Sequence, residues 1–178
     1  MTNTQSTTLS LDDERKDAVW AQRCATLYNV WVQVRYHRRR QRFFDLADKL
    51  TKSLTVVLGA SLMGDALKQY LPVVASAIAS LGLLALVFGY GDRKQLHKEL
   101  AEQAAALVVA IEQVSPYELT AERAAAWGAD YARLCAKAPP PLKTLSLICE
   151  REQSVADGHP AHVAQPFVVA RWFADFKS

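Results

Sequence analysis

The sequence predicts an all-α membrane protein, in which a two-helix transmembrane hairpin has cytosolic helices before and after it. Residues 70–91 contain no ionisable side chain apart from tyrosine. A second uncharged stretch, residues 53–64, lies just upstream. The segments on both sides repeat their apolar residues at helical spacing. We therefore divide the chain into residues 1–10, 11–50, 51–91 and 92–178.

The N-terminal part is predicted to be a tail followed by a long helix. Residues 1–10 are polar and are expected to be disordered, and they show no basic segment followed by an apolar one, so no cleaved signal peptide is predicted. Residues 11–50 contain neither proline nor glycine and are predicted to form one long juxtamembrane helix. Its apolar face is uneven and consists of Val19, Trp20, Leu27, Val30, Trp31 and Val34.

The end of this helix is basic, with the sequence VRYHRRRQRFF at residues 34–44. Such a cluster can bind nucleic acid phosphates, but no nucleic-acid-binding motif surrounds it. Its place close to a predicted bilayer favours anionic lipid headgroups, at roughly 1 kcal/mol per basic residue. The predicted headgroup contacts, before and after the hairpin, are Arg35, Arg38, Arg39, Arg40, Arg42, Arg93, Lys94 and Lys98.

Residues 70–91 are long enough to cross a bilayer as one helix, since they rise about 33 Å against a hydrocarbon core of roughly 30 Å. A helix this apolar can also be the buried core of a soluble protein, but a chain of 178 residues has little mass with which to surround it. Because basic residues near membrane segments stay in the cytoplasm, both termini are expected there, with residues 65–69 in the outer turn.

The upstream run, residues 53–64, rises only about 18 Å and needs neighbouring residues to complete a span. Lys49 and Lys52 can supply them, because their alkyl stems can lie along acyl chains while the ammonium groups reach the headgroups. Asp45 and Asp48 stand four residues earlier, the favourable order for helical ion pairs. These pairs belong either to a solvated helix turn or to a pore mouth, where Asp48 and Lys52 are the candidate lining residues.

Small residues form a stripe on the second apolar helix and recur at the end of the first. In a membrane such residues let helix backbones approach closely, so we predict a helix-packing face. It consists of Ala60, Gly64, Ala75, Ala79, Gly82 and Gly89. Its partner is either the other helix of the hairpin or a neighbouring copy. Ser76 and Ser80 are further candidates for a pore lining, although serine in a membrane helix commonly bonds its own backbone.

Residues 92–178 are predicted to be cytosolic and helical. One helix is expected over 92–114, and a break follows at Ser115 and Pro116. Ser115 with Glu118 forms a capping-box pattern, and Thr120 is a second candidate cap for a helix that ends near Lys137. After three prolines, residues 142–155 are expected to be helical, and the aromatic segment 166–176 is expected to pack against another helix.

The sequence predicts no catalytic residue, no metal site and no cofactor. It contains no glycine-rich phosphate loop, nucleophile elbow or HExxH motif, which lowers the expectation of an enzyme. His159 and His162 have HxxH spacing without a further ligand nearby. His37 and His97 are expected to be packed or interfacial side chains. The three cysteines are widely spaced, as expected of reduced thiols.

Several stretches together resemble the SLATT family, two-helix membrane effectors found beside nucleotide-signalling enzymes in bacterial defence loci. They are VRYHRRR, GDRKQLHKELAEQAAALVVAIEQ, LTAERAAAW and PPPLKTLSLICEREQ, and the resemblance spans roughly residues 15–158. One departure is Arg151 in CERE, where the family pattern has asparagine before the glutamate.

This resemblance implies a homo-oligomeric, pore-forming effector of anti-phage defence that disrupts the bacterial inner membrane and aborts infection. The implied trigger is a separately encoded sensor, such as a nucleotidyltransferase product or a reverse-transcriptase complex. Direct binding to nucleic acid is not expected, whereas contact with anionic lipid is. Two other functions stay open: a holin-like small membrane protein, and a soluble helical interaction protein with residues 70–91 in its core.

Overall fold

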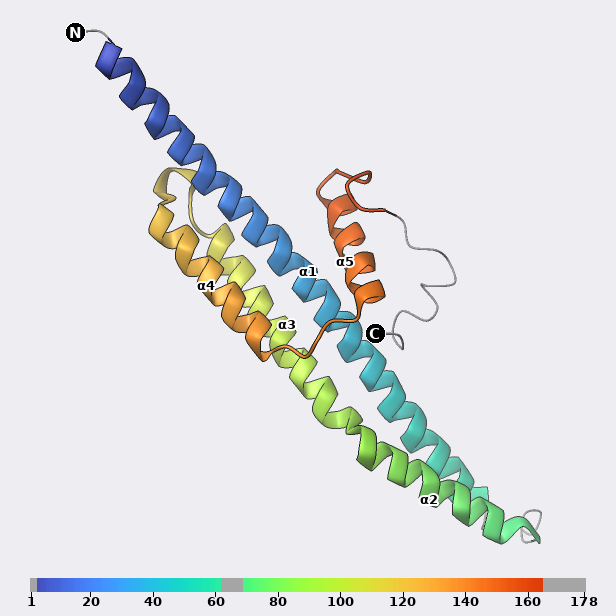
Figure 1. Cartoon of the computed structure of the whole chain (residues 1–178). Helices are drawn as coiled ribbons and strands as arrows, with labels where there is room; N and C mark the ends of the chain where they lie inside the picture. Colours follow the sequence, from blue (N-terminus) through green and yellow to red (C-terminus); the bar gives the residue numbers. More distant parts are fainter. Residues whose placement is uncertain (1–2, 62–68, 165–178) are drawn as a thin grey trace. The chain divides into compact units, whose positions relative to one another are not determined.

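The computed structural model describes residues 3–61 and 69–164, and within those ranges it contains helices and no strand. The order is α1 (Asn3–Ser61), α2 (Leu71–Phe88), α3 (Tyr90–Glu112), a short 3-10 helix η2 (Pro116–Glu118), α4 (Ala121–Lys137) and α5 (Lys143–Ala156). Figure 1 shows these helices along the chain. The all-helical class predicted from the sequence is confirmed for the described residues.

The chain divides into two compact units. The first contains residues 1–36 and 100–178, and the second contains residues 37–99. Helices α1 and α3 each contribute to both units.

Helix α1 is longer than the helix predicted for residues 11–50. It begins at Asn3, inside the segment expected to be a tail, and it continues through the first apolar run to Ser61. Residues 3–58 contain no proline or glycine, so nothing in the backbone interrupts the helix. Residues 62–64 of the first apolar run, residues 65–68 of the expected outer turn (65–69) and the aromatic segment 166–176 lie outside the described residues.

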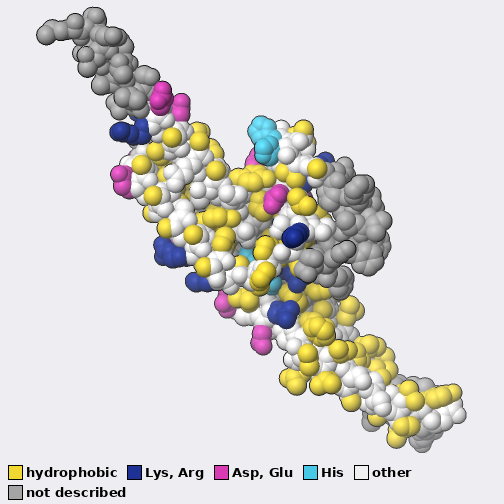
Figure 2. All heavy atoms as spheres, in the orientation of Figure 1, with side chains coloured by type: hydrophobic (Ala, Val, Ile, Leu, Met, Phe, Trp, Pro, Cys, Tyr) yellow, Lys and Arg dark blue, Asp and Glu magenta, His cyan; other side chains and the backbone are white. Residues whose placement is uncertain are grey.

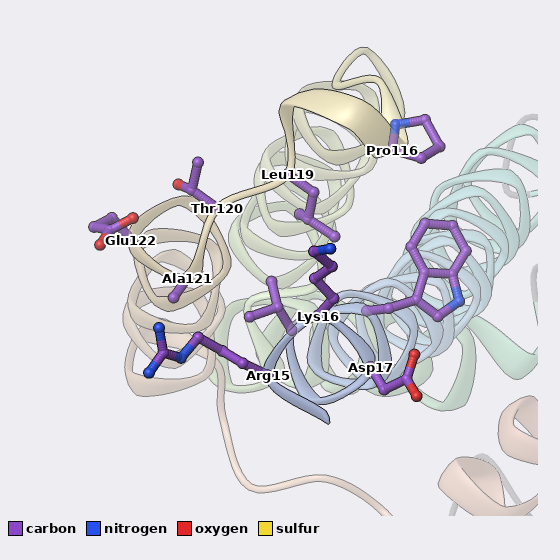
Figure 3. Close-up of a pocket in the computed structure, with 10 residues that line it drawn as sticks. Arg15, Lys16, Asp17, Pro116, Leu119, Thr120, Ala121 and Glu122 are labelled. Carbon is purple, nitrogen blue, oxygen red and sulfur yellow. The ribbon is translucent and has the colours of Figure 1, made fainter. Parts of the chain in front are cut away.

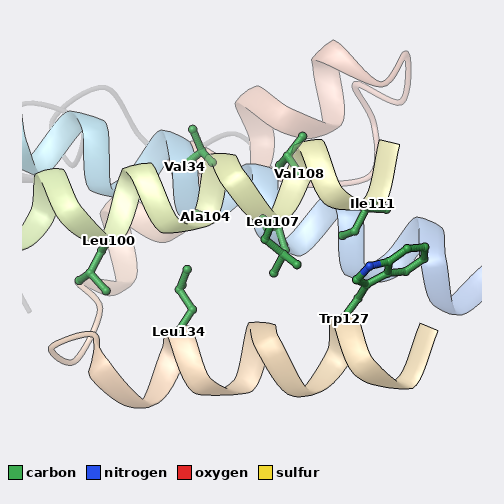
Figure 4. Packing of buried hydrophobic residues seen from close by; sticks show 9 residues of the cluster. Val34, Leu100, Ala104, Leu107, Val108, Ile111, Trp127 and Leu134 are labelled. Carbon is green, nitrogen blue, oxygen red and sulfur yellow. The ribbon is translucent and has the colours of Figure 1, made fainter. Parts of the chain in front are cut away.

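The first unit is built around a three-helix core. Val30 and Val34 of α1 contact apolar side chains of α3, and Trp127 and Leu134 of α4 close the cluster (Figure 4). The α3 contribution is one buried stripe at helical spacing: Leu100, Ala104, Leu107, Val108 and Ile111. The face predicted for α1 is thus confirmed at Val30 and Val34, with Leu27 and Trp31 packed against the same cluster.

Helix α5 packs against a different face of α1. Val32 and Tyr36 form a second apolar cluster, which also includes Leu145, Ile148 and Cys149 of α5. Tyr28 Oη donates to the Glu150 carbonyl at 3.0 Å, and the Leu142 amide donates to Tyr36 Oη at 3.0 Å. In this unit, therefore, one face of α1 contacts α3 and α4, and a different face of α1 contacts α5.

The predicted starts of η2 and α4 are confirmed. Ser115 Oγ accepts from the Tyr117 amide at 3.4 Å, and Thr120 Oγ1 accepts from the Arg123 amide at 3.3 Å. Both side chains satisfy backbone donors that the first helical turn leaves without an intrahelical partner.

The second unit contains the end of α1, the whole of α2 and the beginning of α3. The two apolar arms of this unit, the end of α1 up to Ser61 and helix α2, lie side by side (Figure 1). Pro72 stands in the first turn of α2, where its missing N–H is tolerated. Gly89 ends α2 with φ 53° and ψ 46°, a left-handed conformation that favours glycine. Because α3 starts at the next residue, Gly89 forms the junction between α2 and α3.

Helix α2 is almost entirely exposed. Val74 is its one buried residue, and Leu86 is 80% exposed. Hydrophobic side chains cover much of the visible surface of this part of the chain (Figure 2). They include Val73, Leu83, Leu84, Leu86, Val87 and Phe88 of α2, and Leu46, Leu50, Leu54, Val56 and Val57 of α1.

Among the described residues, one helical stretch is long and apolar enough to cross a membrane. It is Leu71–Glu112, and 6% of its most apolar window is buried. The sequence predicts two such helices. The described part of the first run belongs to a helix with charged residues directly before it, and residues 62–64 of that run lie outside the described ranges. Over the described residues, a second helix of sufficient length and apolar composition is therefore not found.

Candidate functional site

The end of the second unit farthest from the α1–α2 connection contains a cluster of aromatic and charged side chains. His37 of α1 and His97 of α3 meet there, with their Nδ1 atoms 2.9 Å apart, and they are 1% and 3% exposed. Phe44 is buried beside them, and its ring stacks on that of His97 with 5.6 Å between centroids. Of the two settings expected for these histidines, packed or interfacial, both have the packed one.

Two of the predicted headgroup contacts turn toward this cluster. The Arg40 guanidinium lies 4.6 Å from the centroid of Phe44, and that of Arg93 lies 5.9 Å from it. Such cation–π contacts stabilise by about 0.5–1 kcal/mol at exposed sites. Arg93 of α3 therefore contributes to holding α3 beside α1, whereas the contact of Arg40 with Phe44 lies within α1. The sequence did not indicate either contact.

Asp45, the residue after Phe44 on α1, binds two lysines. Lys94 Nζ is 2.6 Å from Asp45 Oδ1, and Lys49 Nζ is 2.7 Å from Asp45 Oδ2. Hydrogen bonds from Lys49 and Lys94 lower the pKa of Asp45 to about 2. The same contact raises the pKa of Lys94. The predicted pair of Asp45 with Lys49 is present, and Lys94 extends it to α3.

The other predicted basic residues have different surroundings. Arg35 belongs to the first unit, where its Nε donates to Gln153 Oε1 of α5 at 2.8 Å. Arg39 is half-buried, whereas Arg38, Arg42 and Lys98 are exposed. Exposed side chains near the apolar arms are the ones available to a lipid surface.

The candidate pore-lining residues make contacts within their own helices. Lys52 Nζ donates to Asp48 Oδ2 at 2.7 Å. The Ser76 hydroxyl donates to the Pro72 carbonyl and the Ser80 hydroxyl to the Ser76 carbonyl, each at 2.8 Å. The serine contacts are those expected of serine in an apolar helix.

The predicted small-residue face is open within this chain. Ala60, Ala75, Ala79 and Gly82 are exposed, and a Cβ added at Gly82 would meet nothing within 4 Å. The half-buried side of α2 is instead formed by Val74, Ala77, Ile78, Leu81 and Ala85. Gly64 lies outside the described residues. Gly89 forms the junction between α2 and α3, so it does not continue the stripe of small residues on α2.

Aromatic side chains stand at both ends of α2. Tyr70 precedes the helix and is half exposed. Phe88 and Tyr90 stack on each other across the junction, with 5.7 Å between ring centroids. Tyrosine and tryptophan are enriched at membrane–water interfaces, because an apolar ring with a polar tip suits that boundary. The separation of the two ends, about 27 Å along the helix, matches a hydrocarbon core.

The first unit contains an open pocket of about 480 Å³ between the start of α1 and the segment leading into α4 (Figure 3). Its charged lining is mixed, with Arg15 and Lys16 beside Asp17 and Glu122. Glu122 already receives hydrogen bonds from its own amide and from the Thr120 hydroxyl, which lower its pKa. Because charges of both signs meet in it, this pocket does not define a class of ligand.

His159 and His162 line a smaller pocket of about 310 Å³ with Asp157, Ser154 and Tyr28. Within the described ranges, no group of three or more His, Cys, Asp or Glu side chains is placed to hold a metal ion. The cysteines in those ranges are free thiols.

Sequence reasoning missed the histidine pair and its Phe44 partner. A usable signal existed on each helix alone: His37, Arg40 and Phe44 share one face of α1, and Arg93 and His97 share one face of α3. Their pairing depends on the antiparallel alignment of two segments 60 residues apart, which no local pattern contains.

Comparisons with protein-family models, curated proteins and solved structures found no match to this chain. Over the residues that the structure describes, the fold and the exposed apolar helix α2 define the class: an all-helical protein with one helical stretch long and apolar enough to cross a membrane.

Proposed function

We propose that this protein is a membrane-embedded, homo-oligomeric effector that forms a pore in the bacterial inner membrane as part of anti-phage defence. The observation that carries the membrane assignment is the exposure of α2. Its most apolar window is only 6% buried, whereas the core helix of a soluble protein would be mostly buried. In water this surface would be a large unfavourable apolar patch, and in lipid it is solvated.

The end of α1 supports a hairpin as the inserted unit. Its apolar side chains Leu54, Val56 and Val57 are exposed in the same compact unit as α2. The Thr51 hydroxyl donates to the Ala47 carbonyl at 2.8 Å and the Thr55 hydroxyl to the Thr51 carbonyl at 2.9 Å, which satisfies both hydroxyls without water. A span completed by residues 62–64 and by the alkyl stems of Lys49 and Lys52 is the proposed first membrane segment.

The proposed orientation has both termini in the cytoplasm. The exposed cations Arg38, Arg42 and Lys98, and the Lys94 ammonium, belong to the segments that flank the two apolar arms. By the positive-inside tendency these flanks stay on the cytoplasmic side, where they meet anionic headgroups. The first unit, with its own apolar core, is then a cytosolic domain.

Pore formation needs several copies, since two helices do not enclose a water-filled path. The open face at Ala75, Ala79 and Gly82 is the proposed contact between copies, with Asp48, Lys52, Ser76 and Ser80 as the candidate lining. The resemblance to the SLATT family supplies the proposed defence role and the separately encoded sensor. A sensor that favours the open assembly would shift the population toward it.

The test is release of an encapsulated dye from anionic liposomes that contain the purified chain. Leakage is expected when the nucleotide product of a neighbouring nucleotidyltransferase is added, and little leakage is expected without it. Leakage that depends on protein concentration alone would favour the holin-like alternative. Gly82→Leu is the matched variant: it meets open space within the chain, so a smaller assembly at unchanged membrane insertion would identify contact between copies.

A further inference from the structure

The contact between His37 and His97 limits which ring nitrogens can take up added protons. With both rings neutral, one Nδ1–H donates to the other Nδ1 across 2.9 Å. A first added proton can reside on Nε2 of the donor ring and leave that hydrogen bond in place. A second proton must reside on the accepting Nδ1, so that two N–H groups face each other and the bond is lost.

The surroundings oppose both protonations. Arg40 of α1 and Arg93 of α3 are the charged groups acting on His97, and both are cations. Three carboxylates of this unit already have partners of their own: Asp45 is shared by Lys49 and Lys94, Asp48 pairs with Lys52, and Glu99 accepts from Gln95. Burial adds to the effect, because a charge at a site that is 1–3% exposed loses most of its hydration.

The ring contacts make the same site responsive to charge. His97 stacks on Phe44 with 12° between the ring planes, and Arg40 lies over Phe44 as well. An imidazolium at His97 would bring a third cation to a ring that already attracts two guanidiniums. Like-charge repulsion would then replace a neutral aromatic stack.

We infer that the His37–His97 pair is an acid-released latch, which joins α1 and α3 at neutral pH and lets them separate at this level when the pair takes up protons. Gly89, the junction between α2 and α3, provides a pivot about which α3 can move. It has a left-handed conformation that glycine adopts without strain. This inference concerns the folded chain and does not rest on the proposed function.

The pKa values agree with this geometry. Burial and the neighbouring His97 lower the pKa of His37 from 6.5 to about 4. Burial, Arg40 and Arg93 lower the pKa of His97 to about 4. Asp45, with a pKa of about 2, keeps its charge throughout this range, so its ion pairs do not explain an opening near pH 4.

The experiment measures the distance between spin labels on the full chain in detergent micelles, from pH 7.5 to pH 3. Labels at Arg38→Cys and Gln95→Cys report on α1 and α3 from exposed positions. Cys24 and Cys135 are replaced by serine, whereas the fully buried Cys149 stays. A second pair, Ala21→Cys with Ala129→Cys, reports on the first unit as a control for general unfolding.

We expect the first distance to lengthen reversibly below about pH 5 while the control distance stays constant, since protonation begins above the folded pKa. Ring-nitrogen resonances should show His37 and His97 titrating together, well below the ordinary histidine pKa of 6.5. His97→Gln can still hydrogen-bond but does not titrate, so its distance should stay short to a lower pH. His97→Phe provides a second non-titrating variant that can stack on Phe44.

Three outcomes would overturn the latch. They are a wild-type distance that does not change down to pH 3, a control pair that separates at the same pH, and two variants that both open over the wild-type pH range. Each would show that uptake of protons by this pair does not release α1 from α3.

Discussion

Lys94 and Asp45 are 49 residues apart in the sequence, and their charged atoms are 2.6 Å apart in the structure. This contact sets the alignment of the two arms, because it joins α1 to the first turn of α3 just after α2 ends. From Asp45 to Ser61, helix α1 rises about 24 Å, close to the 27 Å of α2. The part of α1 from Asp45 to Ser61 is therefore nearly as long as α2.

Asp45→Asn should loosen the base of the arms, because it removes the charge that Lys49 and Lys94 share. Faster hydrogen exchange is expected at the backbone amides of residues 94–98, measured on the protein in detergent micelles. Asp13→Asn is the control, since Asp13 makes an exposed contact to Lys16 at 3.5 Å. Equal protection in both variants would mean that the ion pair does not hold α3.

The histidine pair should make stability depend on pH with a definite sign. Their pKa values are lower in the folded chain, about 4, than the ordinary 6.5, so folding favours the neutral rings. This contribution is complete above pH 6.5 and is lost as the pH falls toward 4. A loss of about 1–3 kcal/mol is expected for the wild type in chemical unfolding. His97→Phe should lose clearly less, and an identical loss would rule out the pair as its source.

Gly89 and Gly82 should respond oppositely to alanine. At Gly89 the left-handed backbone makes a side chain unfavourable by roughly 1–2 kcal/mol, so Gly89→Ala should lower the unfolding temperature. At Gly82 the added Cβ meets open space inside a helix, and Gly82→Ala should stabilise by roughly 0.5–1 kcal/mol. Thermal unfolding in detergent compares them, and equal shifts would contradict the assigned junction.

Binding to anionic vesicles should depend on Arg42 more than on Arg35, although both belong to the same basic segment of the sequence. Arg42 is exposed in the second unit, so Arg42→Gln should weaken binding by about 1 kcal/mol, or roughly fivefold, with a reduced dependence on salt. Arg35 is hydrogen-bonded to Gln153, and Arg35→Gln should leave vesicle binding nearly unchanged. A co-sedimentation titration measures both, and a larger effect at Arg35 would reverse this assignment.

Much of the fold follows from local patterns. The caps at Ser115 and Thr120 satisfy the first amides of their own helices, and the α3 stripe from Leu100 to Ile111 repeats at helical spacing. Such features depend on residues a few positions apart, so the sequence contains them in full.

The base of the arms depends on residues far apart. The contacts of Phe44 with Arg93 and His97 join α1 to α3, and no local spacing encodes them. Arg40 and Gly89 differ for local reasons. The Arg40 guanidinium contacts Phe44 one turn along the same helix, and Gly89 stands where α2 ends in a left-handed conformation.

The most direct test of the membrane assignment is the accessibility of a spin label at Leu86→Cys in anionic liposomes, in the background that lacks Cys24 and Cys135. Leu86 is 80% exposed in the chain, so lipid is its expected environment. We predict strong relaxation by dissolved oxygen, which concentrates in hydrocarbon, and almost none by a water-soluble nickel chelate. A label at Tyr117, which is 99% exposed in the first unit, should show the opposite pattern. Relaxation of the Leu86 label by the nickel chelate as strong as that at Tyr117 would contradict the assignment of α2 to the membrane.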